Sequence, residues 1–273
     1  MTKYDNPNRT LTDPYEGQQL GEIWGYVVDG YFKTDEEARN YKVDQSFVNQ
    51  MINASALDNG LHAGDLKFVD LDGNNKIEQT TSANDRKDMK VIGNSLPRYN
   101  YNFGISADWY GIDFSVLFQG IGKQNWYPGA ETSMFWGPYS RPYASFIPSD
   151  FMSQVWSEEN TDAYFPRPRG YVALGSNREL AVVNTKYLQN LAYCRLKNLS
   201  IGYTLPNKWL SKIGFEKIRV YFSGENLLTF TKLHSDYIDP EQASASNSWK
   251  TSKSDANIYP WAKTYSFGVD ITF

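Results

Sequence analysis

The sequence predicts an all-β fold, made of antiparallel strands of a transmembrane β-barrel with long extracellular loops. Three observations lead to this fold class: the composition, the alternation of apolar and polar residues, and the succession of short and long connections. The composition combines 16% aromatic residues with a mean hydropathy of −0.57 over 273 residues. Alternating strands explain this combination because half of their residues are polar, whereas a helical span needs about 20 consecutive apolar residues.

The last residues of the chain, 265–273, show the clearest alternation. A strand there has Tyr265, Phe267, Val269, Ile271 and Phe273 on one face and only Ser, Gly, Asp and Thr on the other. Such a strand fits the core of a soluble sandwich or the lipid-facing side of an outer-membrane barrel. The aromatic face and the terminal ring favour the membrane, where a final strand ends at the periplasmic interface.

Four earlier segments, 99–109, 112–119, 187–205 and 217–231, are also predicted to be strands, and the last strand is expected to start near Tyr259. In the third segment, Arg195 and Lys197 share the parity of Leu199 and Ile201. Charged residues on an apolar face predict a β-bulge or a shift beyond the membrane level.

The connections between these strands are alternately short and long. Tyr110-Gly111 and residues 206–216 are short, whereas residues 128–186 and 233–258 are long. Tight periplasmic turns and extended outer loops are typical of outer-membrane barrels. A soluble sandwich gives no reason for this separation of loop lengths.

Five strands are fewer than the roughly eight of the smallest known barrels, and an open sheet would expose unpaired backbone groups to lipid. We therefore expect residues 96–273 to form the last five strands of a larger barrel, or to assemble with other chains. The start of the sequence has no apolar signal region, which suggests a fragment or a mis-called start.

Residues 1–95 have no sustained alternation and are expected to form an extracellular loop region. A capped helix is predicted to begin after Thr34, with Glu37 completing the capping box, and to continue through Phe47, Met51 and Ile52.

Several function classes are disfavoured by the residues. A net charge of −4 provides no basic patch for nucleic acid. His62 and His234 lie far apart in the sequence, and Cys194 has no histidine near it to activate it. Adjacent Glu158 and Glu159 have nothing that would position them around a glycosidic bond. The sequence predicts no enzyme and requires no cofactor.

One segment resembles the start of an EF-hand-like calcium loop. Asp70, Asp72 and Asn74 supply side-chain oxygens at alternate positions, and Lys76 would supply its backbone carbonyl. Asn75 replaces the usual glycine but tolerates the left-handed conformation. The twelfth position is Thr81 rather than a bidentate acid. A weak Ca²⁺ site and a simple Asp/Asn/Gly turn both remain open.

A second candidate site is an aromatic loop in the first long connection. Its rings would lie above the barrel, where they could stack on sugars or contact a lid protein. Packing among themselves, or a place in the outer aromatic belt, is the alternative. The residues are Trp126, Tyr127, Phe135, Trp136 and Tyr139.

Six phrases in one order, together with the final strand, resemble a known family. From about Gly17 to Phe273, the chain is similar to the C-terminal third of SusC/RagA-type TonB-dependent outer-membrane transporters. The phrases are GEIWGYVVDGYF at 21–32, GDLKFVDLDGNNKI at 64–77, VIGNSLPRY at 91–99, FSVLFQG at 114–120, RLKNLSIGYTLP at 195–206 and GENLLTFT at 224–231.

The resemblance implies a parent barrel of about 22 strands, plugged by an N-terminal domain and capped by a SusD-like surface lipoprotein. Such proteins lie in the outer membrane of Gram-negative bacteria and import oligosaccharides or peptides with energy relayed by TonB. Plug and TonB box are missing here, so transport by this chain alone is not expected, and TonB would act only through the missing N-terminal part.

The resemblance also implies that the final strand, with the face formed by Tyr265, Phe267, Val269, Ile271 and Phe273, is read by the barrel-assembly machinery. The alternative function is a soluble exported β-protein that binds glycans through the aromatic loop. Charge-free strand faces favour contact with outer-membrane lipid over that alternative.

Overall fold

The computed structural model describes residues 5–49, 60–140, 147–168, 171–175, 178–211, 214–243, 253–254 and 259–273. The chain divides into two compact units. Unit 1 comprises Met1–Leu96, Asn125–Gln189 and Ala243–Asn257, and unit 2 comprises Pro97–Gln124, Asn190–Gln242 and Ile258–Phe273. The predicted boundary between 1–95 and 96–273 matches the first division of the units, but the long connection 128–186 belongs to the unit of the N-terminal residues rather than to the strand region.

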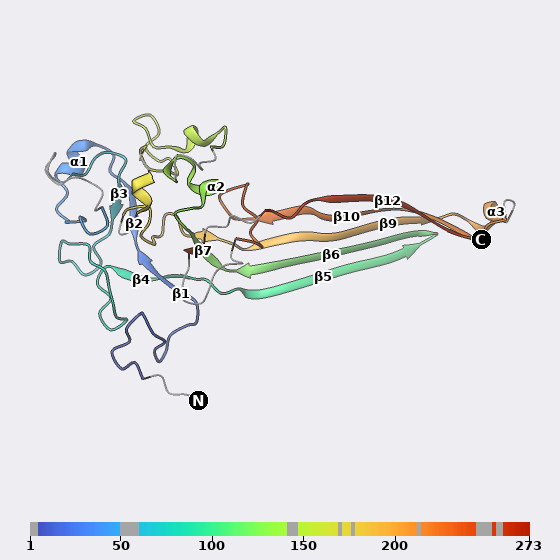
Figure 1. Ribbon diagram of the computed structural model, residues 1–273, viewed down its shortest axis with the longest axis horizontal. Helices are drawn as coiled ribbons and strands as arrows, with labels where there is room; N and C mark the ends of the chain where they lie inside the picture. The colour runs from blue at the N-terminus through green and yellow to red at the C-terminus, as the bar shows by residue number, and fades with distance from the viewer. Residues whose placement is uncertain are drawn as a thin grey trace. The chain divides into compact units, whose positions relative to one another are not determined.

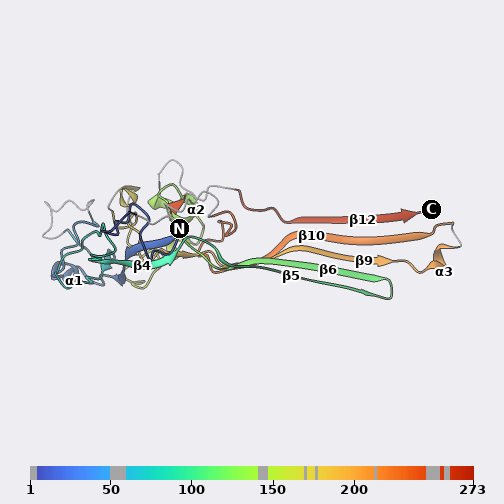
Figure 2. The same ribbon diagram turned by 90° about the horizontal axis from the view of Figure 1, so that it is seen from below.

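Unit 2 is built on one antiparallel sheet with the strand order β12-β10-β9-β6-β5. Figures 1 and 2 show these long strands side by side. Each predicted segment overlaps one of them, although β6 continues four residues beyond the predicted end at 119, and β9 and β12 begin later than expected. Their bounds are Arg98–Trp109 for β5, Ile112–Lys123 for β6, Tyr193–Thr204 for β9, Lys217–Thr231 for β10 and Thr264–Thr272 for β12.

The turns at one end of this sheet are short. Tyr110 and Gly111 have φ angles of 47° and 85°, the positive pair required by a two-residue hairpin turn between twisted strands. A Cβ at Gly111 would lie 2.8 Å from the carbonyl oxygen of Thr204. A short helix, α3 (Asn207–Leu210), lies between β9 and β10 at the same end. We call this the short-turn end and the opposite one the long-loop end.

The predicted bulge is confirmed. Leu117 pairs with Asn198 and Phe118 with Leu196, so Lys197 is an extra residue opposite β6. The bulge reverses the alternation, and Arg195 comes to lie opposite the polar Gln119. A charge that strict alternation would place among apolar residues is thereby moved to the other face.

Unit 1 contains short elements that the alternation did not reveal. Strand β1 (Glu22–Tyr26) pairs with β4 (Met89–Asn94), and β2 (Val28–Tyr31) pairs with β3 (Leu66–Phe68). The other elements are β7 (Asn125–Pro128), β8 (Gln189–Asn190), β11 (Lys253–Ser254), α1 (Asp35–Arg39), α2 (Ser133–Trp136) and the 3₁₀ turns η1 (Gly137–Tyr139), η2 (Phe151–Gln154) and η3 (Tyr171–Leu174). None of the helices in the described part of the chain is long and apolar enough to span a membrane.

Helix α1 begins as predicted but is shorter. The Thr34 hydroxyl accepts the Glu37 N–H at 3.1 Å, and the Glu37 carboxylate accepts the Lys33 N–H at 2.8 Å. The helix ends at Arg39 with Asn40 as its C-cap, and Phe47 lies in a later turn. Beyond the helix, Asp44 forms a β-bridge with Lys76. The expected continuation through Met51 and Ile52 falls outside the described residues.

Candidate functional site: the two faces of the strand sheet

One face of the unit 2 sheet, which we call the apolar face, carries apolar residues in register across all five strands. Phe222 lies opposite Phe267 on one side and Ile201 on the other, and this row continues to Phe114 and Ala107. Neighbouring rows are equally free of charge. The apolar face comprises Phe103, Ile105, Ala107, Trp109, Ile112, Phe114, Val116, Phe118, Leu196, Leu199, Ile201, Tyr203, Val220, Phe222, Leu228, Tyr265, Phe267 and Val269.

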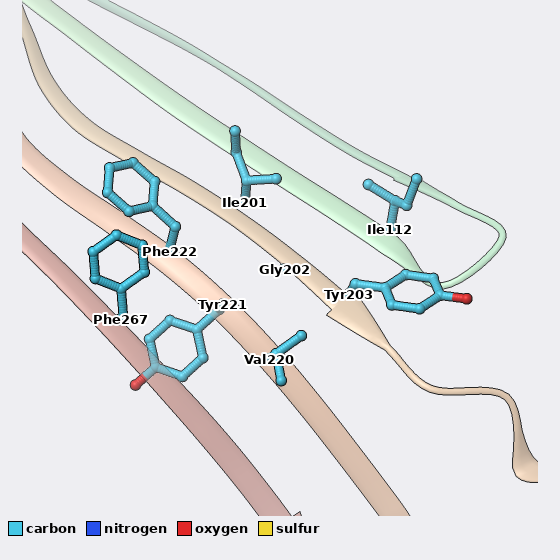
Figure 3. A pocket seen from close by; sticks show the side chains of 8 residues that line it. All are labelled: Ile112, Ile201, Gly202, Tyr203, Val220, Tyr221, Phe222 and Phe267. Atoms are coloured by element: carbon cyan, nitrogen blue, oxygen red, sulfur yellow. The ribbon is translucent and has the colours of Figure 1, made fainter. Parts of the chain in front are cut away.

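The apolar face is open rather than covered. Phe267 is 83% exposed and Trp109 is 69% exposed. A groove of about 480 Å³ runs along the face between the side chains of Ile201, Tyr203 and Phe222 (Figure 3). A contiguous exposed apolar surface of this extent marks contact with a membrane or a partner.

The opposite face, which we call the polar face, carries small and polar side chains at the same level. The hydroxyl oxygens of Ser106 and Ser115 lie 3.2 Å apart. Ser200, Ser223 and Ser266 continue this row across the remaining strands. The sheet therefore separates an uncharged surface from a hydrogen-bonding one.

Near the short-turn end, the polar face holds an ion-pair network. Arg219 crosses β9 to reach Asp113, with Nε–Oδ1 and Nη2–Oδ2 distances of 2.7 and 2.6 Å. Its Nη1 lies 3.2 Å from Asp270 on β12. This crossing requires glycine at position 202, because a Cβ there would lie 2.5 Å from Arg219 Nη2.

A second network lies near the long-loop end. Arg195 donates through Nη2 to Asp239 at 2.7 Å, through Nη1 to Glu241 at 2.6 Å and through Nε to Thr229 at 2.9 Å. Lys197 lies 2.8 Å from the same glutamate. The side chains of Arg195 and Asp239 are only 3% and 4% exposed.

This network fixes residues 239–241, at the start of the second long connection, to strand β9. In the sequence, the parity of Arg195 and Lys197 predicts only a bulge or a shift in alternation. The sequence contains one sign of this network. Two basic residues, Arg195 and Lys197, and two acidic residues, Asp239 and Glu241, have the same spacing of two.

The aromatic residues of the first long connection form a core within unit 1. All five predicted contact residues are at most 3% exposed, and Phe135 packs edge-on against Trp136 and Phe165. The Tyr127 hydroxyl donates to the Leu180 carbonyl at 2.8 Å, and burial raises its pKa. The five rings are thus buried and pack among themselves, which is the alternative to ligand or lid contact. They are Trp126, Tyr127, Phe135, Trp136 and Tyr139.

Contact with a ligand or lid by these five rings would require them to leave that core. Polar contacts hold two more of them in place. Trp136 Nε1 donates to the Gly129 carbonyl at 2.9 Å, and the Tyr139 hydroxyl donates to the Pro166 carbonyl at 2.6 Å.

The acidic loop is held by hydrogen bonds from its own backbone N–H groups to its side chains. Asp70 accepts the N–H groups of Gly73 and Asn75, both at 2.7 Å, and Asn75 has a φ of 63°. Burial acts to raise the pKa of Asp70, but these N–H groups outweigh it and hold the pKa below its usual range. Asn74 Oδ1 accepts the Lys76 N–H at 2.8 Å.

The structure adds a residue that spacing did not identify. One carboxylate oxygen each of Asp70, Asp72 and Asp88 lie within 4.8 Å of one another. Asp88 is fully buried, and its carboxylate accepts the N–H groups of Leu71 at 2.8 Å and Glu78 at 2.7 Å. Burial raises the pKa of Asp88, and the neighbouring acids raise it further.

The remaining candidates are not brought together. His62 Nδ1 lies 3.7 Å from Asp35. Glu158 and Glu159 are exposed, and Cys194 is a free thiol on β9. The five residues of the final-strand face are between 47% and 83% exposed, and the Phe273 ring centroid lies 5.2 Å from that of Phe215.

The known proteins that are similar to this chain agree with its strand pattern. No protein-family model matches the chain. TonB-dependent receptor P3 of Formosa agariphila is 28% identical over 264 residues, which cover 94% of this chain and 22% of the receptor. TonB-dependent receptor P39 of the same organism is 26% identical, with 94% and 25% covered. The chain resembles the TonB-dependent receptors.

Solved structures show the same fold. A chain of the RagAB peptide importer in its open-open state aligns with a TM-score of 0.55 and 20% identity, over 96% of this chain and 25% of that one. The closed-closed state gives a TM-score of 0.55, 19% identity, and 100% and 25% coverage. The predicted resemblance to TonB-dependent transporters is confirmed, and the chain spans about a quarter of the length of the relatives it matches.

Proposed function

We propose that this chain is the C-terminal part of a TonB-linked outer-membrane transporter that imports oligosaccharides or peptides. The apolar face would contact lipid, and the polar face would line the barrel interior. The observation that carries the proposal is the charge-free, exposed apolar face across five paired strands. Lipid-facing bands of outer-membrane barrels have this character.

Strand length supports the proposal. Strands β5 and β6 have 12 residues each. At about 3.3 Å per residue such a strand is roughly 40 Å long. Tilted by about 40°, it would cross roughly 30 Å, the thickness of a bilayer's hydrocarbon core.

The partners follow from the same proposal. A SusD-like lipoprotein would cover the long-loop side, as the resemblance implies and as the two-component name RagAB of the structural relatives suggests. TonB would act through an N-terminal part not contained in these residues. The exposed ridge from Tyr265 to Phe273 is what recognition by the barrel-assembly machinery would require.

The proposal predicts where the protein containing this chain is found. It should fractionate with the outer membrane and leave it only in detergent, because the apolar face would otherwise meet water. Membrane fractionation followed by size-exclusion chromatography with and without detergent measures this. A monodisperse protein that melts cooperatively without detergent would contradict the proposal and favour a soluble glycan-binding protein.

We also propose that the acidic loop of unit 1 binds Ca²⁺ weakly. Asp70, Asp72 and Asn74 would supply side-chain oxygens and Lys76 its backbone carbonyl, and Asp88 would replace the missing acid of the twelfth position. Hard oxygen ligands of this kind suit calcium.

The calcium proposal predicts a dissociation constant of about 10⁻⁴ to 10⁻³ M, the range of extracellular modules. Asp72→Ala should abolish the response to calcium, because it removes the side-chain oxygen that either Asp or Asn supplies at this position of the pattern. Calorimetric titration of the purified protein measures it, with Asp85→Ala as the control outside the cluster. Equal calcium responses in wild type and Asp72→Ala would eliminate the site.

A further inference from the structure

A second groove lies on the sheet at the long-loop end. It has a volume of about 370 Å³ and is lined by residues of β5, β6, β9 and β10. Its lining includes Gly122, Ala192 and the rings of Tyr101 and Phe230. A Cβ at Gly122 would lie 3.2 Å from the Cβ of Tyr99, so the strands are close here.

The polar side chains that line this groove include Lys232 and Asn190. Lys232 follows directly on β10, is exposed and lines the groove. No carboxylate in the described ranges pairs with it, in contrast to Arg195 and Arg219. The Asn190 side-chain oxygen accepts the Ala192 N–H at 2.9 Å, which leaves its NH₂ group as a donor.

The groove continues the apolar face to its outer margin. Phe230 lies opposite Cys194, which lies opposite Gly120, and Tyr101 completes this row. Along β5, the distance from Tyr99 to Trp109 corresponds to roughly 33 Å of strand at about 3.3 Å per residue. With a tilt of about 40° this is roughly 25 Å across a bilayer, the height of a lipid-facing band. Lys232 therefore lies at headgroup level when the apolar face lies in lipid.

We propose that this groove binds the phosphate of an anionic lipid headgroup, with the phosphate at Lys232 and Asn190 and the first acyl carbons against Phe230 and Tyr101. The inference rests on the proposed function, because it places the apolar face in a bilayer. The ammonium group of Lys232, which pairs with no carboxylate among the described residues, selects the negative charge. The short side chain of Ala192 leaves space in the groove for the headgroup.

The test is native mass spectrometry of the purified protein containing this chain. The protein is exchanged from detergent into an equimolar mixture of dioleoyl-phosphatidylglycerol and dioleoyl-phosphatidylcholine, which share their acyl chains. Wild type should retain phosphatidylglycerol preferentially. Lys232→Gln should lower that preference about tenfold, because the loss of one hydrogen bond to a charged group lowers a binding constant by roughly a factor of ten. Ala192→Leu, which fills the groove and leaves the charge, should lower it as well.

The matched control is Lys263→Gln. Lys263 is exposed just before β12 and does not line the groove. Equal losses in the two lysine variants would mean general attraction of interfacial lysines and would overturn the inference, as would an unchanged preference in both Lys232→Gln and Ala192→Leu. Displacement of the lipid by millimolar inorganic phosphate would identify free phosphate as the ligand and overturn it too. A wild-type protein that retains neither lipid and needs no detergent would instead refute the proposed function.

Discussion

Replacing Arg195 with methionine should destabilise the protein by about 3 to 5 kcal/mol, the cost of removing one partner from a buried ion pair. Asp239, 4% exposed at its side chain, would lose its only ion-pair partner among the described residues. Glu241 would retain Lys197, whose side chain is 17% exposed. Urea unfolding of the detergent-solubilised protein measures the change in the free energy of unfolding.

Lys197→Met is the matched control, because it removes a cation from the same network at a more accessible place. Its effect should be about 1 kcal/mol or less. Combining Arg195→Met with Asp239→Asn should recover part of the loss, since no unpaired buried carboxylate would remain at position 239. Limited proteolysis should cut near residues 239–241 faster in Arg195→Met. Equal destabilisation by the two single substitutions would contradict the assigned role of the buried pair.

The long strands were predictable because their alternation extends over many residues. Strand β10 has the predicted bounds, Lys217–Thr231, and the hairpin turn is at Tyr110-Gly111 as expected. The bulge was predictable for a related reason. A charge on an apolar parity has a high cost in a buried or lipid-facing row, so the alternation has to shift near Arg195.

Unit 1 was less predictable because its contacts link residues distant in sequence. Strands such as β3, with three residues, are too short for a period to show. The burial of Trp136 depends on Phe165 and Tyr187, which no local pattern connects to it. Asp88 reaches the acidic loop because the chain between Glu78 and β4 returns to it, whereas EF-hand spacing points to Thr81 and Asp85.

Replacing Ile201 with arginine should cost about 2 to 4 kcal/mol, the penalty for a basic residue on the lipid face at the bilayer midplane. Ile201 lies in the middle of the apolar face, opposite Phe114 and Phe222. Its neighbour Ser200 belongs to the polar face, opposite Ser115 and Ser223, so Ser200→Arg introduces the same charge one residue away. Ser200→Arg should cost less, because the guanidinium group can be solvated on the polar face of the sheet. Refolding into phospholipid vesicles measures the cost of both substitutions, and outer-membrane abundance should follow the same order.

If the apolar face met water instead, Ile201→Arg would be neutral or would improve solubility, since the Ile201 side chain is already 42% exposed. The order of the two adjacent substitutions therefore decides which face of the sheet lies in lipid.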